Sequence, residues 1–141
     1  MTMGKRLGSA TAVLGLTAAG MIAATGSAEA AAAYNGACGS GYSVVGSKDV
    51  GDGKAFITYS SATGYNCVVT VNDHPGTSTY LDARLRIHRT DTVWKSSEMD
   101  AGTYSSYAGP VYVYAAHSCI DYGGSAGNAS YIQIDYGVHC G

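Results

Sequence analysis

Charge is scarce in this chain of 141 residues, and so are proline and every aromatic residue except tyrosine. Charged residues make up 13% of the sequence, with two prolines, one phenylalanine and one tryptophan. Basic residues cluster only at 84–89, where Asp82 and Asp91 flank them. Proteins that bind nucleic acids present clustered Lys and Arg, so this pattern argues against a nucleic-acid partner.

Metal-binding motifs are also lacking. The cysteines form no Cys-x-x-Cys pair, and the nearest grouping is His117-x-Cys119 together with His139-Cys140. Structural zinc sites usually have closely spaced cysteine pairs. We therefore expect no metal site, and no motif indicates another cofactor.

Residues 1–30 have the composition of a secretory signal peptide. Lys5 and Arg6 give a positive start, 12–24 is an uncharged apolar stretch, and 28–30 (Ala-Glu-Ala) is a small-residue cleavage site. The apolar stretch is shorter than the roughly 20 strongly apolar residues of a membrane-spanning helix. We expect export followed by cleavage, with no membrane association afterwards.

Cleavage at this site would leave residues 31–141, enough for a single β domain and no more. This exported part holds six basic and nine acidic residues, a net charge of −3. It contains all four cysteines, and an even number in a short secreted chain predicts a disulfide framework.

Four cysteines allow three pairings. We favour Cys38–Cys67 with Cys119–Cys140, because each bond ties neighbouring segments and the two bonds staple the ends of the chain separately. Each bond would close a loop of 20 to 30 residues. Loops of that length correspond to about 3–4 kcal/mol of stabilisation in the chain-entropy treatment.

Residues 34–141 show no sustained helical periodicity, and Gly, Ser, Thr and Asn interrupt the apolar runs every eight to twelve residues. This spacing is typical of short antiparallel strands in a sandwich or barrel. We predict an all-β fold, a small disulfide-stapled antiparallel sandwich or partly open barrel of about seven to nine strands. The expected strands span 41–46, 54–60, 66–72, 79–89, 110–116, 118–123 and 130–137.

The clearest alternation of apolar and polar residues lies at 79–89, which predicts a strand with one face in water. Its apolar side would hold Leu81, Ala83, Leu85 and Ile87, and its wet side Asp82, Arg84, Arg86 and His88.

Turn residues predict how the other strands connect. We expect a hairpin of 54–60 with 66–72 through Gly64, and a second of 110–116 with 118–123. In 130–137, Ile132 and Ile134 are expected to face inward. The segment 90–107 is expected to be a long loop with one short strand.

Tyrosine is the compositional oddity, with twelve residues, all of them after position 33. Tyrosine joins an apolar ring to a hydroxyl that prefers a wet or hydrogen-bonded partner, which suits interfaces and stacking on sugars. Alternatively, tyrosine fills strand positions and replaces phenylalanine in the core. The candidate binding surface consists of Tyr107, Tyr112, Tyr114 and Tyr122.

A nucleophile motif is formally present, since 123–127 reads Gly-Gly-Ser-Ala-Gly with Ser125 in the central position. Asp135 and His139 follow in the chain order of a hydrolase triad. The nucleophile elbow, however, needs a strand, a sharp turn and a helix, whereas these glycines suit a turn between two strands. We therefore expect no catalytic residue, and a small hydrolase using Ser125 is the least favoured alternative.

Three stretches carry a resemblance to a known family: AYNGACGSGYSVV (33–45), TGYNCVVTV (63–71) and YAGPVYVYAAHSCIDYGG (107–124). They are similar to the spore-associated protein A family, small secreted proteins of streptomycetes and related actinobacteria. The resemblance covers nearly the whole exported part, including its four cysteines. It implies export and association with the spore or aerial-hypha surface, and it brings no catalytic residues.

We thus expect a secreted, non-enzymatic protein, extracellular or on the spore or cell-wall surface. It would adsorb to cell-wall or spore-coat material, polysaccharide or protein, through its tyrosine-rich β surface. The alternative is an inhibitor or toxin-like effector of an extracellular enzyme, with 90–107 as the loop presented to the target. The ligand and the oligomeric state are left open.

Overall fold

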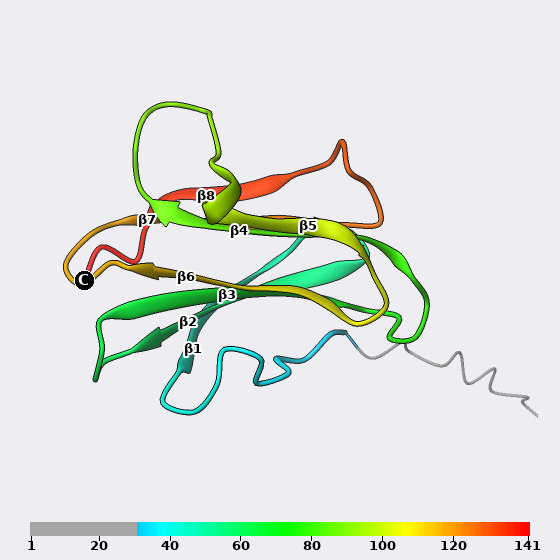
Figure 1. Cartoon of the computed structure of the whole chain (residues 1–141), viewed down its shortest axis with the longest axis horizontal. Coiled ribbons are helices and arrows are strands. Elements are labelled where there is room, and N and C mark those ends of the chain that lie inside the picture. The colour runs from blue at the N-terminus through cyan, green and yellow to red at the C-terminus, as the bar shows by residue number, and fades with distance from the viewer. Residues whose placement is uncertain (1–30) are drawn as a thin grey trace, which may run out of the picture.

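The computed structural model describes residues 31–141, which form two stacked β-sheets (Figure 1). The signal peptide expected over 1–30 lies outside the described residues. Within 31–141, no helix is long and apolar enough to cross a membrane. The elements in chain order are β1 (Ser43–Asp49), β2 (Gly53–Ser60), β3 (Tyr65–Asn72), β4 (Thr79–Ile87), the 3-10 helix η1 (Ser96–Glu98), β5 (Met99–Tyr104), β6 (Tyr107–Tyr114), β7 (Ile120–Ala126) and β8 (Gln133–Val138).

Each sheet has four strands. Sheet A has the order β1-β2-β3-β6 and sheet B the order β5-β4-β7-β8. All neighbouring strands pair antiparallel. The predicted all-β fold of about seven to nine strands is confirmed, as a sandwich of eight.

The connections between strands match the prediction only in part. β2 and β3 form the expected hairpin, and Gly64 takes a positive φ of 76° in its turn. The second expected hairpin is wrong, because β6 pairs with β3 of sheet A whereas β7 pairs with β4 and β8 of sheet B. Placing β6 and β7 in opposite layers buries apolar residues of both strands, including Val111 and Ile120, in one core between the sheets.

Sheet A is apolar on both of its faces. The main core lies between the two sheets and includes Ile57 and Val68 of sheet A together with Leu81 and Leu85 of sheet B. A smaller cluster lies on the outer face of sheet A, where the N-terminal segment 32–42 covers it. Its buried members are Cys38, Phe56, Cys67, Val69 and Val71. Cys67 is therefore buried as expected, but on the outer side of the sandwich.

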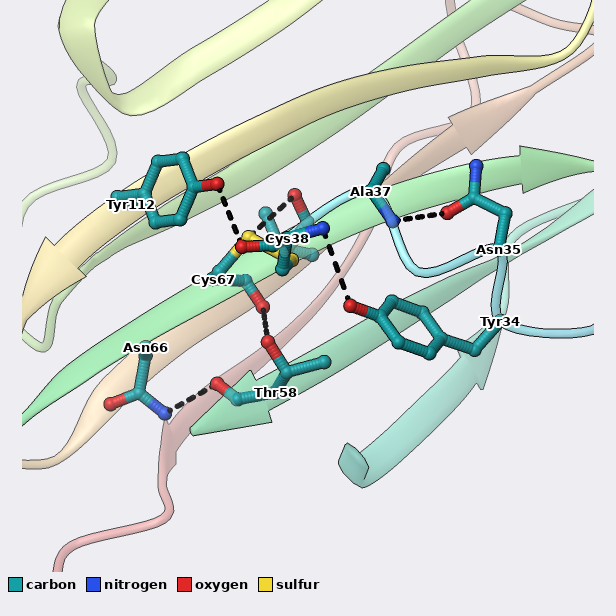
Figure 2. Close-up of a disulfide and its surroundings, with 9 residues drawn as sticks. Tyr34, Asn35, Ala37, Cys38, Thr58, Asn66, Cys67 and Tyr112 are labelled. Atoms are coloured by element: carbon teal, nitrogen blue, oxygen red, sulfur yellow. Dashed lines mark hydrogen bonds between the residues drawn. A yellow bond between two sulfur atoms is a disulfide. The ribbon is translucent and has the colours of Figure 1, made fainter. Parts of the chain in front are cut away.

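The disulfides are Cys38–Cys67 and Cys119–Cys140, the two pairs favoured from the sequence. Figure 2 shows how the first one fixes segment 32–42 on sheet A. The Tyr112 hydroxyl donates to the Cys38 carbonyl at 3.0 Å, and the Cys38 amide donates to the Tyr34 hydroxyl at 3.3 Å. The segment is thus tied to the sheet at Cys38 by one disulfide and one hydrogen bond from Tyr112, while the bond to Tyr34 lies within the segment.

The predicted wet face of β4 is wrong for two of its four residues. Asp82 and Arg86 are fully buried. Arg86 is covered by the loop between β4 and η1, whose Asp91 and Val93 carbonyls accept hydrogen bonds from it, whereas the Asp82 carboxylate accepts hydrogen bonds from Tyr80 and Arg84 of the same strand. Leu81, Ala83 and Leu85 lie in the main core as expected, whereas Ile87 is exposed.

The predicted faces of β8 are also wrong. Ile132, just before β8, is exposed. Asp135 pairs in register with the buried Tyr122, so Asp135 faces inward and its neighbour Ile134 faces the other side of the sheet. Asp135 also forms an ion pair with Lys48 of β1, with Lys48 Nζ 2.6 Å from Asp135 Oδ1, which links the edge strands of the two sheets. β8 is an edge strand, so a carboxylate on its inner side reaches the rim of the sandwich, where a partner charge is available.

We predict that the Cys38→Ala/Cys67→Ala double variant loses about 3–4 kcal/mol of unfolding free energy, because it opens a loop with a sequence separation of 29. Urea denaturation measures the loss. Segment 32–42 should also become sensitive to proteolysis in the folded protein.

The matched control is the Cys119→Ala/Cys140→Ala variant, whose bond has a sequence separation of 21. It should lose a similar free energy, about 3 kcal/mol, and leave segment 32–42 protected. Equal protease sensitivity of both variants would contradict the anchoring role of Cys38–Cys67.

Candidate binding surface

Three of the four tyrosines predicted as a binding surface share the outer face of sheet A. The register of β3 with β6 sets Tyr107 opposite Val71 and Tyr112 opposite Cys67, and both partners belong to the outer cluster. Tyr114 follows Tyr112 by two positions, so it emerges on the same side. All three tyrosines are exposed.

An irregularity in β6 brings Tyr107 onto this face. Tyr107 and Tyr112 are five positions apart, and strict alternation would place them on opposite faces. The register shifts between Val68 and Thr70 of β3, opposite the Gly109–Pro110 stretch. Such a bulge changes the phase of the strand, which returns Tyr107 to the outer side.

Tyr122 does not belong to the surface, and its inclusion was wrong. It is 3% exposed and lies in the main core, opposite Leu85 in the register of β7 with β4. Burial, with a smaller contribution from the charge of Asp135, raises the pKa of Tyr122 to about 12. Tyr122 thus fills a core position as an uncharged aromatic residue, as a phenylalanine would.

Two further tyrosines complete the exposed face. The rings of Tyr65 and Tyr114 meet edge-on with centroids 5.6 Å apart, and those of Tyr42 and Tyr112 do so at 5.7 Å. Edge-to-face pairs of this kind are favourable and fix the rings relative to each other. We call these residues the tyrosine ridge; it consists of the exposed Tyr65, Tyr107, Tyr112 and Tyr114 together with the half-buried Tyr42.

The ridge combines exposure with fixed geometry. Tyr114 is 58% exposed, yet its ring lies so close to Gly64 that a Cβ there would come within 2.7 Å of it. The hydroxyls of Tyr65, Tyr107 and Tyr114 form no hydrogen bond within residues 31–141. A ligand on the ridge would therefore meet preoriented rings with available hydroxyls.

Sequence reasoning missed Tyr42 and Tyr65. Tyr65 directly follows the Gly64 turn, which was a usable signal, but its contact with Tyr114 depends on the pairing of β3 with β6. Tyr42 reaches Tyr112 because segment 32–42 crosses the outer face of sheet A. Neither contact follows from local alternation.

A cleft of about 380 Å³ is lined in part by the last residues of the chain, Cys140 and Gly141. Its lining includes His117 and His139, which both have positive φ, 61° and 51°. Each histidine lies next to or near a cysteine of the Cys119–Cys140 bond, so the disulfide brings the two imidazoles to one place. Within the described residues, no group of three or more His, Cys, Asp or Glu is arranged to hold a metal ion.

The outer side of sheet B carries a buried charge network centred on Arg86 and Asp121. These residues are opposite each other in register, and Arg86 Nε lies 2.7 Å from Asp121 Oδ2. Asp121 Oδ1 lies 2.6 Å from His88 Nδ1 and accepts the Gly137 amide at 2.9 Å. The Trp94 ring covers the guanidinium, 4.3 Å from its central carbon.

This environment sets the charge of Asp121. Burial by itself would raise the pKa of the carboxyl group, but hydrogen bonds from His88, Arg86 and Gly137 outweigh it, and the pKa is lowered. Asp121 is thus held as a carboxylate beneath the surface of sheet B.

The residues of the formal nucleophile motif do not assemble. Ser125 is fully buried, and its hydroxyl donates to the Asn128 carbonyl. Asp135 forms its ion pair with Lys48, and His139 lies in the cleft. Ser125 and Asp135 are thus bonded to residues outside the motif, and the hydrolase alternative loses its geometric basis.

The fold and the site together define a two-disulfide β-sandwich with an exposed aromatic face on one layer. The chain is 41% identical to spore-associated protein A of Streptomyces coelicolor, over 96% of this chain and 88% of that protein. It therefore belongs to the spore-associated protein A family, as the resemblance indicated. No protein-family model matches the chain, and no solved structure does.

We predict that acid destabilises the domain through Asp121. Because the pKa of Asp121 is lower in the folded than in the unfolded chain, its contribution is complete above the unfolded value, about 3.9, and is lost as the pH falls through the folded value. Carboxyl-carbon NMR titration should therefore give an apparent pKa for Asp121 below about 3.9.

The free energy of unfolding should decline in the same pH range. A titration midpoint for Asp121 at or above that of a free aspartate would contradict the described network.

Proposed function

We propose that the chain is a secreted, non-enzymatic protein of the spore or cell surface that adsorbs to cell-wall or spore-coat polysaccharide through its tyrosine ridge. Three observations support this proposal. The relative from Streptomyces coelicolor is named as spore-associated. The two disulfides suit an oxidising, extracytoplasmic environment. The ridge supplies an exposed aromatic platform.

The tyrosine ridge is the observation that carries the proposal. Fixed aromatic rings can stack on the apolar faces of sugar rings, while phenol hydroxyls bond to the sugar hydroxyls at the edge. The preorganised pairs Tyr65–Tyr114 and Tyr42–Tyr112 reduce the entropy lost when a ligand binds. No side chain of the ridge is charged, so such binding should depend little on salt.

Segment 32–42 is part of this binding surface as well as a cover for the outer cluster. Tyr42 is held next to Tyr112, while the Tyr112 hydroxyl bonds to Cys38. Replacing Tyr112 would therefore disturb both the ridge and the anchor of the segment. Tyr65 and Tyr114 are the better positions for a test, because they carry exposed rings without that second role.

We predict that the Tyr65→Ala/Tyr114→Ala variant loses retention on intact spores or purified wall polymers by about tenfold or more. Two lost stacking contacts correspond to at least about 1.4 kcal/mol, which is a factor of ten in affinity. The baits are intact spores, peptidoglycan, chitin and cellulose, each with salt and with soluble-sugar competition. Soluble sugar should relieve the binding of the unchanged protein, and salt should not.

The matched control is Tyr131→Ala/Tyr136→Ala. Both tyrosines are 54% exposed, a fraction similar to the 58% of Tyr114. They lie outside sheet A, Tyr136 in β8 and Tyr131 just before that strand. Retention should stay unchanged in this control. Equal losses in both double variants, or none in either, would remove the ridge as the adsorbing surface.

A further inference from the structure

The loop between β4 and η1 projects from sheet B, on the side of the sandwich opposite segment 32–42 (Figure 1). We call residues 88–95 the sheet B loop. Val93, near its middle, is 68% exposed, and Thr92 is exposed too. Such a protrusion would usually be mobile, but the contacts of this loop argue otherwise.

Arg86 holds the loop from below at two carbonyl groups. Its Nη2 donates to the carbonyl of Asp91 at 2.7 Å, and its Nη1 donates to the carbonyl of Val93 at 2.8 Å. These two carbonyls flank Thr92. The guanidinium is fully buried, so both hydrogen bonds are shielded from water.

A second set of contacts braces the same residues from the side. Arg89 donates to the Val93 carbonyl at 2.6 Å and to the Asp91 carboxylate at 2.8 Å, and it forms a two-bond pair with Glu98 at 2.6 and 2.8 Å. The Val93 amide donates to the Asp91 carboxylate at 3.0 Å. The backbone is therefore fixed on both sides of Thr92.

The Thr92 carbonyl differs from its neighbours. No group within residues 31–141 donates a hydrogen bond to it, whereas the carbonyls of Asp91 and Val93 are both occupied. The loop thus offers one peptide bond, Thr92–Val93, with a free carbonyl on an exposed and otherwise immobilised backbone.

We propose that the sheet B loop is a substrate-like inhibitor loop that binds the active site of a secreted serine protease, with Thr92 in the primary specificity pocket. A serine protease needs a free carbonyl at the bond it attacks, which its oxyanion hole binds. Elastase-type pockets are small and take small side chains, so they fit Thr92 better than wide or charged pockets do. A loop that is already rigid loses little entropy on binding.

The hydrogen bonds of Arg86 and Arg89 to the loop, which we call the arginine clamp, also explain how the loop would resist cleavage. Attack of the catalytic serine oxygen on the Thr92 carbonyl carbon breaks the Thr92–Val93 bond, and the serine proton passes through the catalytic histidine to the Val93 nitrogen. Arg86 and Arg89 still hold the Val93 carbonyl, so the new amine stays beside the acyl group. The reverse reaction then restores the peptide bond before water reaches the acyl group.

The inference does not depend on the polysaccharide proposal. The sheet B loop and the tyrosine ridge lie on opposite layers and share no residue, so either proposal can fail while the other holds.

The test is a titration of the secreted, oxidised protein against elastase-type, chymotrypsin-type and trypsin-type serine proteases. We expect stoichiometric inhibition of the elastase-type enzyme, with inhibition of the other two at least 100-fold weaker. Thr92→Leu should transfer the inhibition to the chymotrypsin-type enzyme, and Thr92→Lys should transfer it to the trypsin-type enzyme. Thr90→Lys, an exposed substitution two positions away, is the control and should transfer nothing.

A second variant tests the arginine clamp formed by Arg86 and Arg89. Arg89→Gln removes the lateral brace but keeps the buried Arg86, so the domain should stay folded by near-ultraviolet circular dichroism. It should be cleaved at Thr92–Val93 at least tenfold faster than the unchanged protein.

Three outcomes would overturn the inference. The first is that neither the unchanged protein nor either Thr92 variant inhibits any of the proteases. The second is that the protein inhibits a protease but substitution of Thr92 does not change which protease is inhibited. The third is that the unchanged loop is cleaved rapidly, as an ordinary substrate would be.

Discussion

The outer half of sheet B depends on one buried charge, the guanidinium of Arg86. A guanidinium carries five N–H donors and stays ionised, so burying it requires a counter-ion and several acceptors. Asp121 supplies the counter-ion, and the carbonyls of Asp91 and Val93 supply acceptors. An uncompensated buried charge costs about 3–5 kcal/mol, so the loop that provides these carbonyls has to fold over the sheet. The buried charge thus determines the shape of an exposed segment.

Local alternation predicted the strands and much of the core, since it reports which residues share a face. It placed Leu81 and Leu85 of β4 correctly in the core, and it separated Val111 from Tyr112 on β6. It had no means of predicting that a loop would cover Arg86, because the sequence of a strand does not say what lies over its polar side. The misplacement of Tyr122 was avoidable.

Ile120 and Tyr122 are two positions apart on β7, so the apolar Ile120 already indicated an inward direction for its neighbour. Tyr107 shows the opposite case, because a bulge that the sequence did not reveal put it on the expected face. The ridge itself arises from contacts between distant segments. Tyr42 joins it because Cys38–Cys67 holds segment 32–42 across sheet A, and pairing preferences within strands carry no such information.

The two layers give the domain two independent outer faces. The outer face of sheet A carries fixed aromatic rings and few charges, which suits a broad contact with a polymer surface. The outer side of sheet B carries a narrow, charge-braced loop, which suits insertion into a concave partner. A protein adsorbed through sheet A would leave the sheet B loop directed away from the adsorbing surface. Under the two proposals, the domain would act as an inhibitor retained on the surface of the spore or cell.

The most direct test of the central claim, that buried Arg86 immobilises an exposed loop, is a measurement of backbone ¹⁵N relaxation. An unbraced surface loop has order parameters below about 0.6, whereas rigid backbone gives about 0.85. We expect the amides of Asp91, Thr92 and Val93 to reach the values of the neighbouring strands β4 and β7. Values below about 0.6 for these amides would mean that the loop is not held, and the account of sheet B would be wrong.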